Sequence, residues 1–123
     1  MTEFLVFVYG SLKRGEPHHD RMVGAIFEGE TCLFGYHLVA YEEAYPALVS
    51  SPEGGESSHV FGEIFRVTAD QLRSLDEFEE CPTLYQRSPV LLADGRSAQA
   101  YVIPEERAAP YLRIGASWSA PVK

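Results

Sequence analysis

The sequence predicts an α+β fold, a small mixed and mostly antiparallel β-barrel flanked by short helices. Many short segments are rich in β-branched and aromatic residues, which is typical of strands. One segment has the pattern of an amphipathic helix, and strands and helices do not alternate as they do in parallel α/β proteins. A sheet of many short strands has reason to curl into a barrel, because closure hides its edges.

The first predicted strand covers residues 4–9, which are continuously apolar or aromatic and therefore expected to be buried on both faces. Further strands are expected within residues 25–41, interrupted by Gly29 and Gly35, and at 45–49 and 59–67. The last two, at 84–92 and 97–103, flank the hairpin signal Asp94-Gly95. A short helix is expected near residues 19–26, a loop at 50–58 and a helical turn in the tail, 104–123.

The clear helix begins after Thr68, which can cap it, and Gln71 stands three residues later as a capping box requires. Its apolar stripe consists of Leu72, Leu75 and Phe78. Because the residue before a proline avoids the helical conformation, Pro82 is expected to end the helix by about Cys81.

The composition restricts the partners. A chain of 123 residues corresponds to one ordinary domain, and 46% hydrophobic and 23% charged residues are the balance of a globular protein. The formal net charge of −8 repels phosphate backbones, and no basic stripe offsets it. Nucleic acid and anionic membrane surfaces are therefore not expected as partners.

The cysteines and histidines indicate neither a disulfide framework nor a metal site. Cys32 and Cys81 are far apart and are expected to be reduced, buried thiols, and the four histidines form no ligand pattern. The apolar run at residues 4–9 is too short for a signal peptide or a spanning helix. A cytoplasmic location is therefore expected.

The predicted helix carries a candidate catalytic acid. On a helical wheel Glu79 projects between Leu72 and Leu75, into the apolar stripe, whereas Glu77 and Glu80 project away from it. Burial, neighbouring acids and the partly negative end of the helix would all raise the pKa of Glu79 toward neutrality. Such a carboxyl suits general acid/base chemistry. Two alternatives stay open: an ion pair with Arg87, or an unwound last turn that places Glu79 in water.

A second candidate site is the turn after the first strand, Tyr9-Gly10-Ser11-Leu12. Gly10 allows the backbone to turn and a ligand to approach closely, and successive backbone N–H groups can bind a carboxylate. Ser11 offers a hydroxyl donor, and Lys13 and Arg14 follow with positive charge. The alternative is an ordinary tight turn without a ligand.

Together, two stretches resemble the signatures of the γ-glutamyl cyclotransferase-like family. The stretch 8–15, VYGSLKRG, is similar to its N-terminal signature, and 75–87, LDEFEECPTLYQR, is similar to its second one. The second stretch, with 45–49 and 60–65, is closest to the γ-glutamylamine cyclotransferase branch. The two signatures in this order are far more specific than either alone, and the resemblance implies one domain of this kind over residues 1–123.

The resemblance implies a small β-barrel and an enzyme that needs no cofactor or metal. It implies that Tyr9, Gly10, Ser11 and Leu12 bind the α-carboxylate end of a small γ-glutamyl amine or amino acid, mainly through backbone amides. It makes Glu79 the catalytic residue. The α-amine of the substrate would attack its own γ-carbonyl, giving 5-oxoproline and a free amine by lyase or acyltransferase chemistry.

Tyr85 and Arg87 match the second signature and are candidates for a supporting layer around the glutamate. For Tyr85 the alternative is core packing with a satisfied hydroxyl. Two other functions stay open: a non-catalytic ligand-binding or interaction protein on the same fold, and removal of a γ-glutamyl group from a biosynthetic intermediate. The sequence leaves the oligomeric state and the leaving amine open.

Overall fold

The computed structural model describes residues 3–42, 45–52 and 58–119. The strands are β1 (Glu3–Val8), β2 (Ile26–Phe34), β3 (Tyr36–Tyr41), β4 (Tyr45–Ser50), β5 (His59–Thr68), β6 (Gln86–Leu91), β7 (Ser97–Val102) and β8 (Arg113–Ile114). The helical elements are the 3-10 turn η1 (His19–Met22), the helix α1 (Ala69–Phe78) and the short α2 (Glu105–Ala108). No helix among these residues is long and apolar enough to cross a lipid bilayer.

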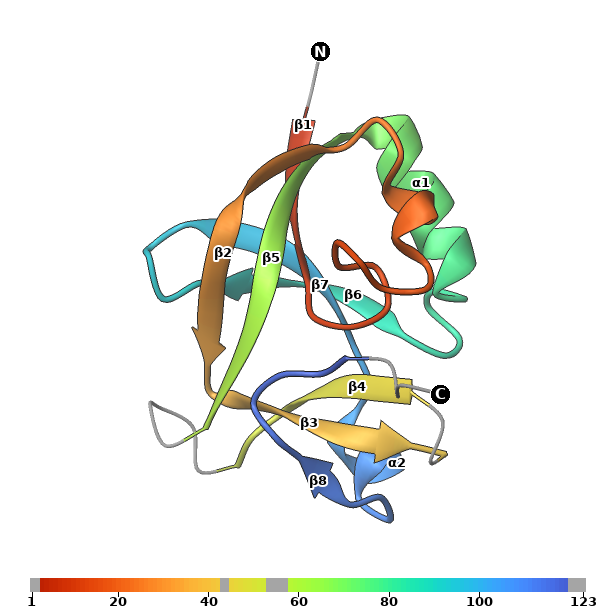
Figure 1. Ribbon diagram of the computed structural model, residues 1–123. Helices are drawn as coiled ribbons and strands as arrows, with labels where there is room; N and C mark the ends of the chain where they lie inside the picture. The colour runs from red at the N-terminus through yellow and green to blue at the C-terminus, as the bar shows by residue number, and fades with distance from the viewer. Residues whose placement is uncertain (1–2, 43–44, 53–57, 120–123) are drawn as a thin grey trace.

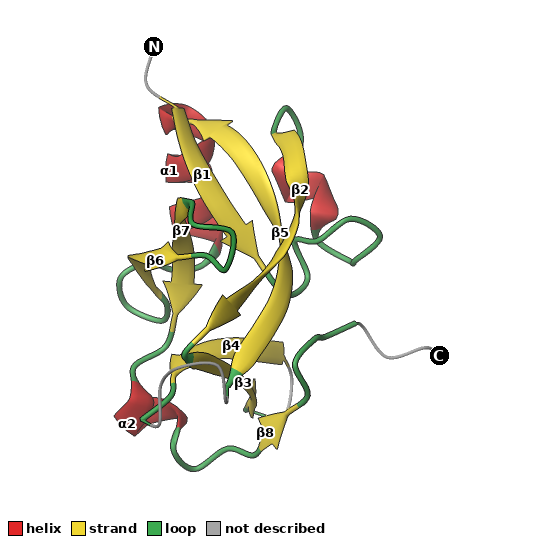
Figure 2. Cartoon of the chain, turned by 90° about the vertical axis from the view of Figure 1, so that its left-hand side faces the viewer, coloured by secondary structure: helices red, strands yellow, loops and turns green. Residues whose placement is uncertain are grey.

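The strands form one strongly curled sheet in the order β2-β5-β1-β7-β4-β3-β8, with β6 paired to β7 (Figures 1 and 2). Most neighbouring strands are antiparallel, but β7 runs parallel to both β1 and β4. Within the sheet, strand β7 therefore connects β1, near the start of the chain, to β4, near its middle. The predicted α+β class and the curled, mostly antiparallel sheet are confirmed.

The core lies on both faces of β1, as its continuous apolar run predicted. Val6 and Val8 pack into one hydrophobic cluster, while Phe7 and Tyr9 pack into a second cluster on the opposite face. Gly62 of β5 makes room for this strand, because a Cβ atom there would come within 2.6 Å of the Phe7 ring. The middle of β1 is thereby fixed against β5, and the turn that follows it starts from a rigid position.

Helix α1 begins as its sequence predicted. The side chain of Thr68 accepts a hydrogen bond from the backbone N–H of Gln71 at 3.2 Å, and the Gln71 side chain accepts one from the N–H of Thr68 at 2.7 Å. Leu72 and Leu75 are buried against the core. In Figure 1 the turn η1 lies beside α1, and the Gln71 side chain donates to the carbonyl of Val23 just after that turn.

Several elements differ from the prediction. Helix α1 ends at Phe78 rather than near Cys81, because Glu80 adopts a left-handed conformation with φ of 54° that no helix can continue. The short strand β8 was not predicted, and it pairs with β3. Cys32 and Cys81 are free, as expected, but both are partly exposed rather than buried. Residues 53–57 of the predicted loop lie outside the described residues.

Candidate active site

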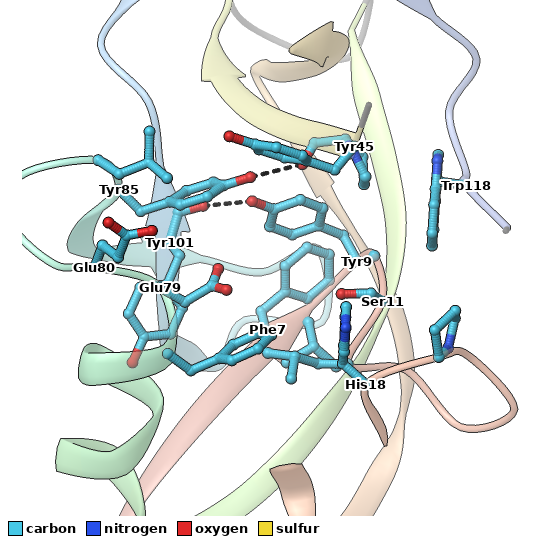
Figure 3. Close-up of a pocket in the computed structure, with 17 residues that line it drawn as sticks. Phe7, Tyr9, Ser11, His18, Tyr45, Glu79, Glu80, Tyr85, Tyr101 and Trp118 are labelled. Carbon is cyan, nitrogen blue, oxygen red and sulfur yellow. Dashed lines mark hydrogen bonds between the residues drawn. The ribbon is translucent and has the colours of Figure 1, made fainter. Parts of the chain in front are cut away.

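A cavity of about 440 Å³ opens between the turn after β1, the end of α1 and strands β4 and β7 (Figure 3). The predicted substrate-binding residues Tyr9, Gly10, Ser11 and Leu12 line it, and so do Glu79 and Tyr85. The remaining lining residues are Phe7, Val8, Pro17, His18, Tyr45, Pro46, Phe78, Glu80, Leu84, Tyr101 and Trp118. Of the predicted site residues, the structure places all but Arg87 on this one cavity.

Glu79 is held in the cavity by the end of the helix. It is the residue that caps α1, and its backbone N–H still donates to the carbonyl of Leu75 at 2.9 Å. The chain then reverses, and the N–H of Cys81 returns to the carbonyl of Asp76 at 2.9 Å. The last turn is thus closed by hydrogen bonds, and the alternative in which it unwinds and carries Glu79 into water does not occur.

The environment of Glu79 favours its protonated form. Burial raises the pKa of this carboxyl from its ordinary 4.5 to about 7. Of the three causes expected from the sequence, burial is the one that operates. A carboxyl with such a pKa is charged in a large fraction of molecules at cellular pH and can both accept and return a proton.

Arg87 does not pair with Glu79. Its guanidinium makes a two-pronged ion pair with Asp76, at 2.8 and 3.2 Å, and a further bond to Gln99 at 3.2 Å. The Tyr101 hydroxyl also donates to Asp76, at 2.6 Å. Asp76 lies in the last turn of α1, whereas Arg87 is on β6 and Tyr101 is on β7. This network therefore fastens the part of the helix that presents Glu79 to the sheet.

The turn after β1 has the properties of an anion site. The carbonyls of Gly10, Ser11 and Leu12 are all occupied, by Lys13 N–H at 3.1 Å, His18 N–H at 2.9 Å and His19 Nδ1 at 2.9 Å. Within the described part of the chain, the backbone N–H groups of these same three residues donate to no other residue. Because these three residues line the cavity, their N–H groups are the candidate donors for an anionic ligand there.

Gly10 is needed for close packing. A Cβ atom at this position would lie 2.8 Å from Cγ of Pro46, closer than real Cβ contacts come. The turn and β4 can therefore form one continuous wall of the cavity only if residue 10 lacks a side chain. This gives a physical reason for the glycine that the sequence placed between strand and loop.

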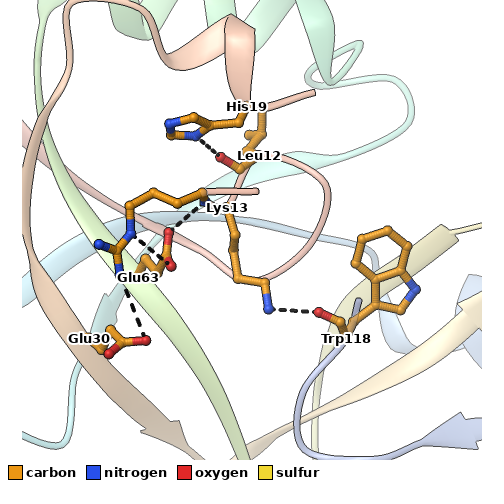
Figure 4. A network of polar contacts seen from close by, with 7 residues as sticks. Leu12, Lys13, His19, Glu30, Glu63 and Trp118 are labelled. Atoms are coloured by element: carbon orange, nitrogen blue, oxygen red, sulfur yellow. Dashed lines mark hydrogen bonds and ion pairs between the residues drawn. The ribbon is translucent and has the colours of Figure 1, made fainter. Parts of the chain in front are cut away.

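The two basic residues after the turn act on the protein itself. Arg14 donates from its backbone N–H, at 2.9 Å, and from its side chain, at 3.2 Å, to the buried carboxylate of Glu63. Lys13 donates from Nζ to the carbonyl of Trp118 at 2.7 Å, which ties the tail to the turn (Figure 4). The contacts of both side chains therefore fix the shape of the turn.

The sequence did not reveal several residues of the cavity. Tyr101 and Trp118 had no local signal, since they reach the site only through the pairing of β7 and the return of the tail. Pro46 belongs to a stretch that fits the γ-glutamylamine branch, but only the structure shows its contact with Gly10. Among the described residues no group of three or more His, Cys, Asp and Glu side chains is arranged to hold a metal ion.

Comparison with known proteins now identifies the family. The model of the family described as gamma-glutamyl cyclotransferase, AIG2-like, matches residues 6–120. The chain belongs to this family. It is 48% identical over 92 residues to the human gamma-glutamylaminecyclotransferase, an alignment that covers 68% of this chain and 58% of that protein. It is 41% identical over 90 residues to the mouse protein of the same name, covering 68% of this chain and 59% of the mouse protein.

The chain thus spans less than two thirds of the length of these curated relatives of the cyclotransferase family. The alignments with solved structures cover more of this chain. The crystal structure of an AIG2-like protein from Mus musculus has a TM-score of 0.77 and 34% identity, covering 97% of this chain and 90% of that one. The crystal structure of a protein specific to uropathogenic E. coli has a TM-score of 0.76 and 26% identity, covering 93% of this chain and 89% of that one. These likenesses confirm the predicted family and fold.

Proposed function

We propose that this protein is a cofactor-free γ-glutamyl cyclotransferase that converts a small γ-glutamyl amine or amino acid to 5-oxoproline and a free amine. One observation carries the proposal: a partly buried carboxyl with a pKa of about 7 shares a cavity with a turn whose three backbone N–H groups have no hydrogen-bond partner among the described residues. The family membership and the names of the human and mouse relatives support the same activity and favour γ-glutamyl amines as the substrate class.

In this reaction the backbone N–H groups of Gly10, Ser11 and Leu12 bind the α-carboxylate of the substrate. Glu79 in its charged form takes a proton from the α-ammonium group, and the neutral amine attacks the γ-carbonyl carbon. A new C–N bond closes the five-membered lactam, the original amide C–N bond breaks, and Glu79 returns the proton to the leaving amine. Because nucleophile and electrophile belong to one molecule, holding the substrate in a folded conformation supplies much of the acceleration.

The test is an assay of 5-oxoproline after incubation with γ-glutamyl amines, γ-glutamyl amino acids and glutathione. Turnover of at least one γ-glutamyl amine is expected, and Glu79→Gln should abolish it while the fold and the binding persist, since an amide nitrogen does not accept the ammonium proton. Binding of these compounds without any 5-oxoproline would instead indicate a ligand-binding protein on the same fold. Full activity in Glu79→Gln would exclude the acid/base role of this residue.

A further inference from the structure

A second carboxylate, that of Asp76, lies one helical turn before Glu79. Its Oδ1 accepts hydrogen bonds from Arg87 Nε at 2.8 Å and from the Tyr101 hydroxyl at 2.6 Å. Its Oδ2 accepts another from a terminal nitrogen of Arg87 at 3.2 Å. A carboxyl group that is bonded to a guanidinium at both oxygens is in its charged form. Residues three apart on a helix are neighbours on its surface, so this negative charge lies close to the catalytic carboxyl.

The charge of Asp76 nevertheless has no effect on Glu79. A like charge one turn away would be expected to hinder the ionisation of Glu79, but burial accounts for its raised pKa without a contribution from Asp76. The ion pair gives the physical reason, because it holds a positive charge 2.8 Å from the negative one. Two opposite charges so close together act on a third group as a dipole, and the potential of a dipole falls off faster with distance than that of a single charge.

Tyr101 connects this ion pair to the cavity. Its side chain lines the cavity beside Glu79 (Figure 3). Burial and the hydrogen bond to Asp76 raise the pKa of Tyr101 well above its ordinary value. The negative charge of Glu79 acts in the same direction, and the positive charge of Arg87 acts in the opposite one. The glutamate and both members of the ion pair therefore lie within electrostatic range of one phenol.

Other titratable groups surround Glu79. Those that line the cavity are Tyr9 after β1, His18 before η1, Tyr45 on β4, and Glu80 and Tyr85 between α1 and β6. Three more lie outside it: Glu77 on α1, Arg21 against the ring of Phe78, and Arg107, which donates to the carbonyl of Leu84. Burial raises the pKa of the three tyrosines, which therefore stay neutral at cellular pH. A substitution of Asp76 or Arg87 leaves all of these groups in place, so a change in the titration of Glu79 reports on the ion pair.

We propose that Arg87 is a positioning residue that acts on Glu79 through Asp76: it fastens the last turn of α1 to the sheet and cancels the charge that Asp76 would otherwise present to the catalytic carboxyl. This inference rests on the proposed function and deepens it. It gives a role to a residue of the second sequence signature that does not line the cavity. Without Arg87, an unpaired carboxylate would make Glu79 keep its proton, and less of the base form would be available at cellular pH.

The experiment follows the titration of Glu79 by NMR in protein with isotope-labelled glutamate side chains, and Glu79→Gln identifies the signal. Arg87→Gln should raise the midpoint of this titration by about 0.5–1 pH unit, because Asp76 is left as an unbalanced like charge. Asp76→Asn should lower the midpoint by a similar amount, because Arg87 is left as an unbalanced positive charge. The double variant Asp76→Asn/Arg87→Gln removes both charges and should restore the midpoint of the parent.

Arg73→Gln is the matched control. Arg73 also pairs with an aspartate, Asp70, at 3.0 Å, but nearer the start of the same helix and on its exposed surface. Its loss changes the net charge equally and should leave the midpoint of Glu79 unchanged. The apparent pKa in the pH profile of kcat/KM for a γ-glutamyl amine should move in the same directions as the NMR midpoint. Thermal melting verifies the fold of each variant, and if Arg87→Gln does not fold, the direction of the shift in Asp76→Asn decides.

Opposite shifts in the two single variants and their cancellation in the double variant cannot arise from a loosened helix, which would make the double variant the most disturbed. The inference is overturned by an unchanged midpoint in Arg87→Gln, by shifts in one direction in both single variants, by a double variant that is not restored, or by an equal shift in Arg73→Gln. If turnover persists in any of these cases, the proposed function stands without this role for Arg87. A protein in which Glu79 titrates as expected in every variant but which releases no 5-oxoproline would contradict the proposed function alone.

Discussion

Replacing Glu79 by Gln should make the protein more stable at alkaline pH, although it removes the proposed catalytic group. Burial raises the pKa of this carboxyl from 4.5 to about 7, so the folded protein binds its proton more tightly than the unfolded chain does. As the pH rises from about 4.5 to above 7, ionisation therefore costs the folded state stability. The interval between the two pKa values corresponds to about 3 kcal/mol.

The amide of Gln is neutral at every pH and close in shape to the protonated carboxyl. We expect the free energies of unfolding of Glu79→Gln and the parent to be similar near pH 4. As the pH rises through 7, the free energy of unfolding of the variant should increasingly exceed that of the parent, by about 3 kcal/mol at pH 8.5. Urea denaturation at a series of pH values measures the difference directly, and the other ionisable groups largely cancel between the two proteins.

Glu77→Gln is the control for this experiment, because it removes a carboxyl from the same end of α1 at an exposed position. It separates the effect of burial from the general effect of one fewer negative charge in an acidic protein. If the difference between Glu79→Gln and the parent were independent of pH, or if it fell as the pH rose, Glu79 would not be a desolvated carboxyl. The acid/base role inferred for it would then lose its physical basis.

Three further predictions concern activity and the turn. The value of kcat/KM should rise with pH and level off above an apparent pKa near 7, because Glu79 must be charged to accept a proton, and a flat profile from pH 5 to 8 would contradict this. Gly10→Ala should lower the free energy of unfolding, measured by urea denaturation, by about 1–3 kcal/mol and raise KM, because its Cβ collides with the proline ring of β4. Gly115→Ala is its control and should change the stability little, because the space around Gly115 is open. Glu63→Gln should raise KM by loosening the turn and lower the free energy of unfolding by about 1–3 kcal/mol. Glu30→Gln is its control: the Glu30 side chain is 72% exposed, so KM and the free energy of unfolding should change little. Equal effects of the two substitutions would refute the anchoring role of Glu63.

The parts of the fold that depend on local chemistry could be predicted from the sequence. The apolar run of β1, the capping box at Thr68 and Gln71 and the turn signal at Asp94-Gly95 each specify their conformation through nearby residues. The direction of Glu79 followed from helical periodicity, and its partly buried position on the cavity agrees with it. Local pattern was sufficient because each of these features involves neighbours along the chain.

The end of α1 and the far wall of the cavity could not be predicted in this way. Pro82 marked a limit for the helix, but the left-handed conformation of Glu80 stops it earlier, and nothing in the sequence pattern signals that conformation. The sequence left open an ion pair between Arg87 and Glu79, whereas the partner of Arg87 is Asp76. Such choices between acids one helical turn apart depend on how β6 meets α1, which is a property of the assembled sheet.

The parallel pairing of β7 with both β1 and β4 has a consequence for how the protein folds. Strand β7 is synthesised long after β1 and β4, so both strands lack this neighbour until β7 has been made. Contacts of such large sequence separation also form slowly. A nascent chain that stops before Ser97 lacks the strand that carries Tyr101, and with it the partner of the Tyr9 hydroxyl. Ligand binding should therefore appear only at the end of folding, which makes it a sensitive reporter of complete folding in pulse-labelling experiments.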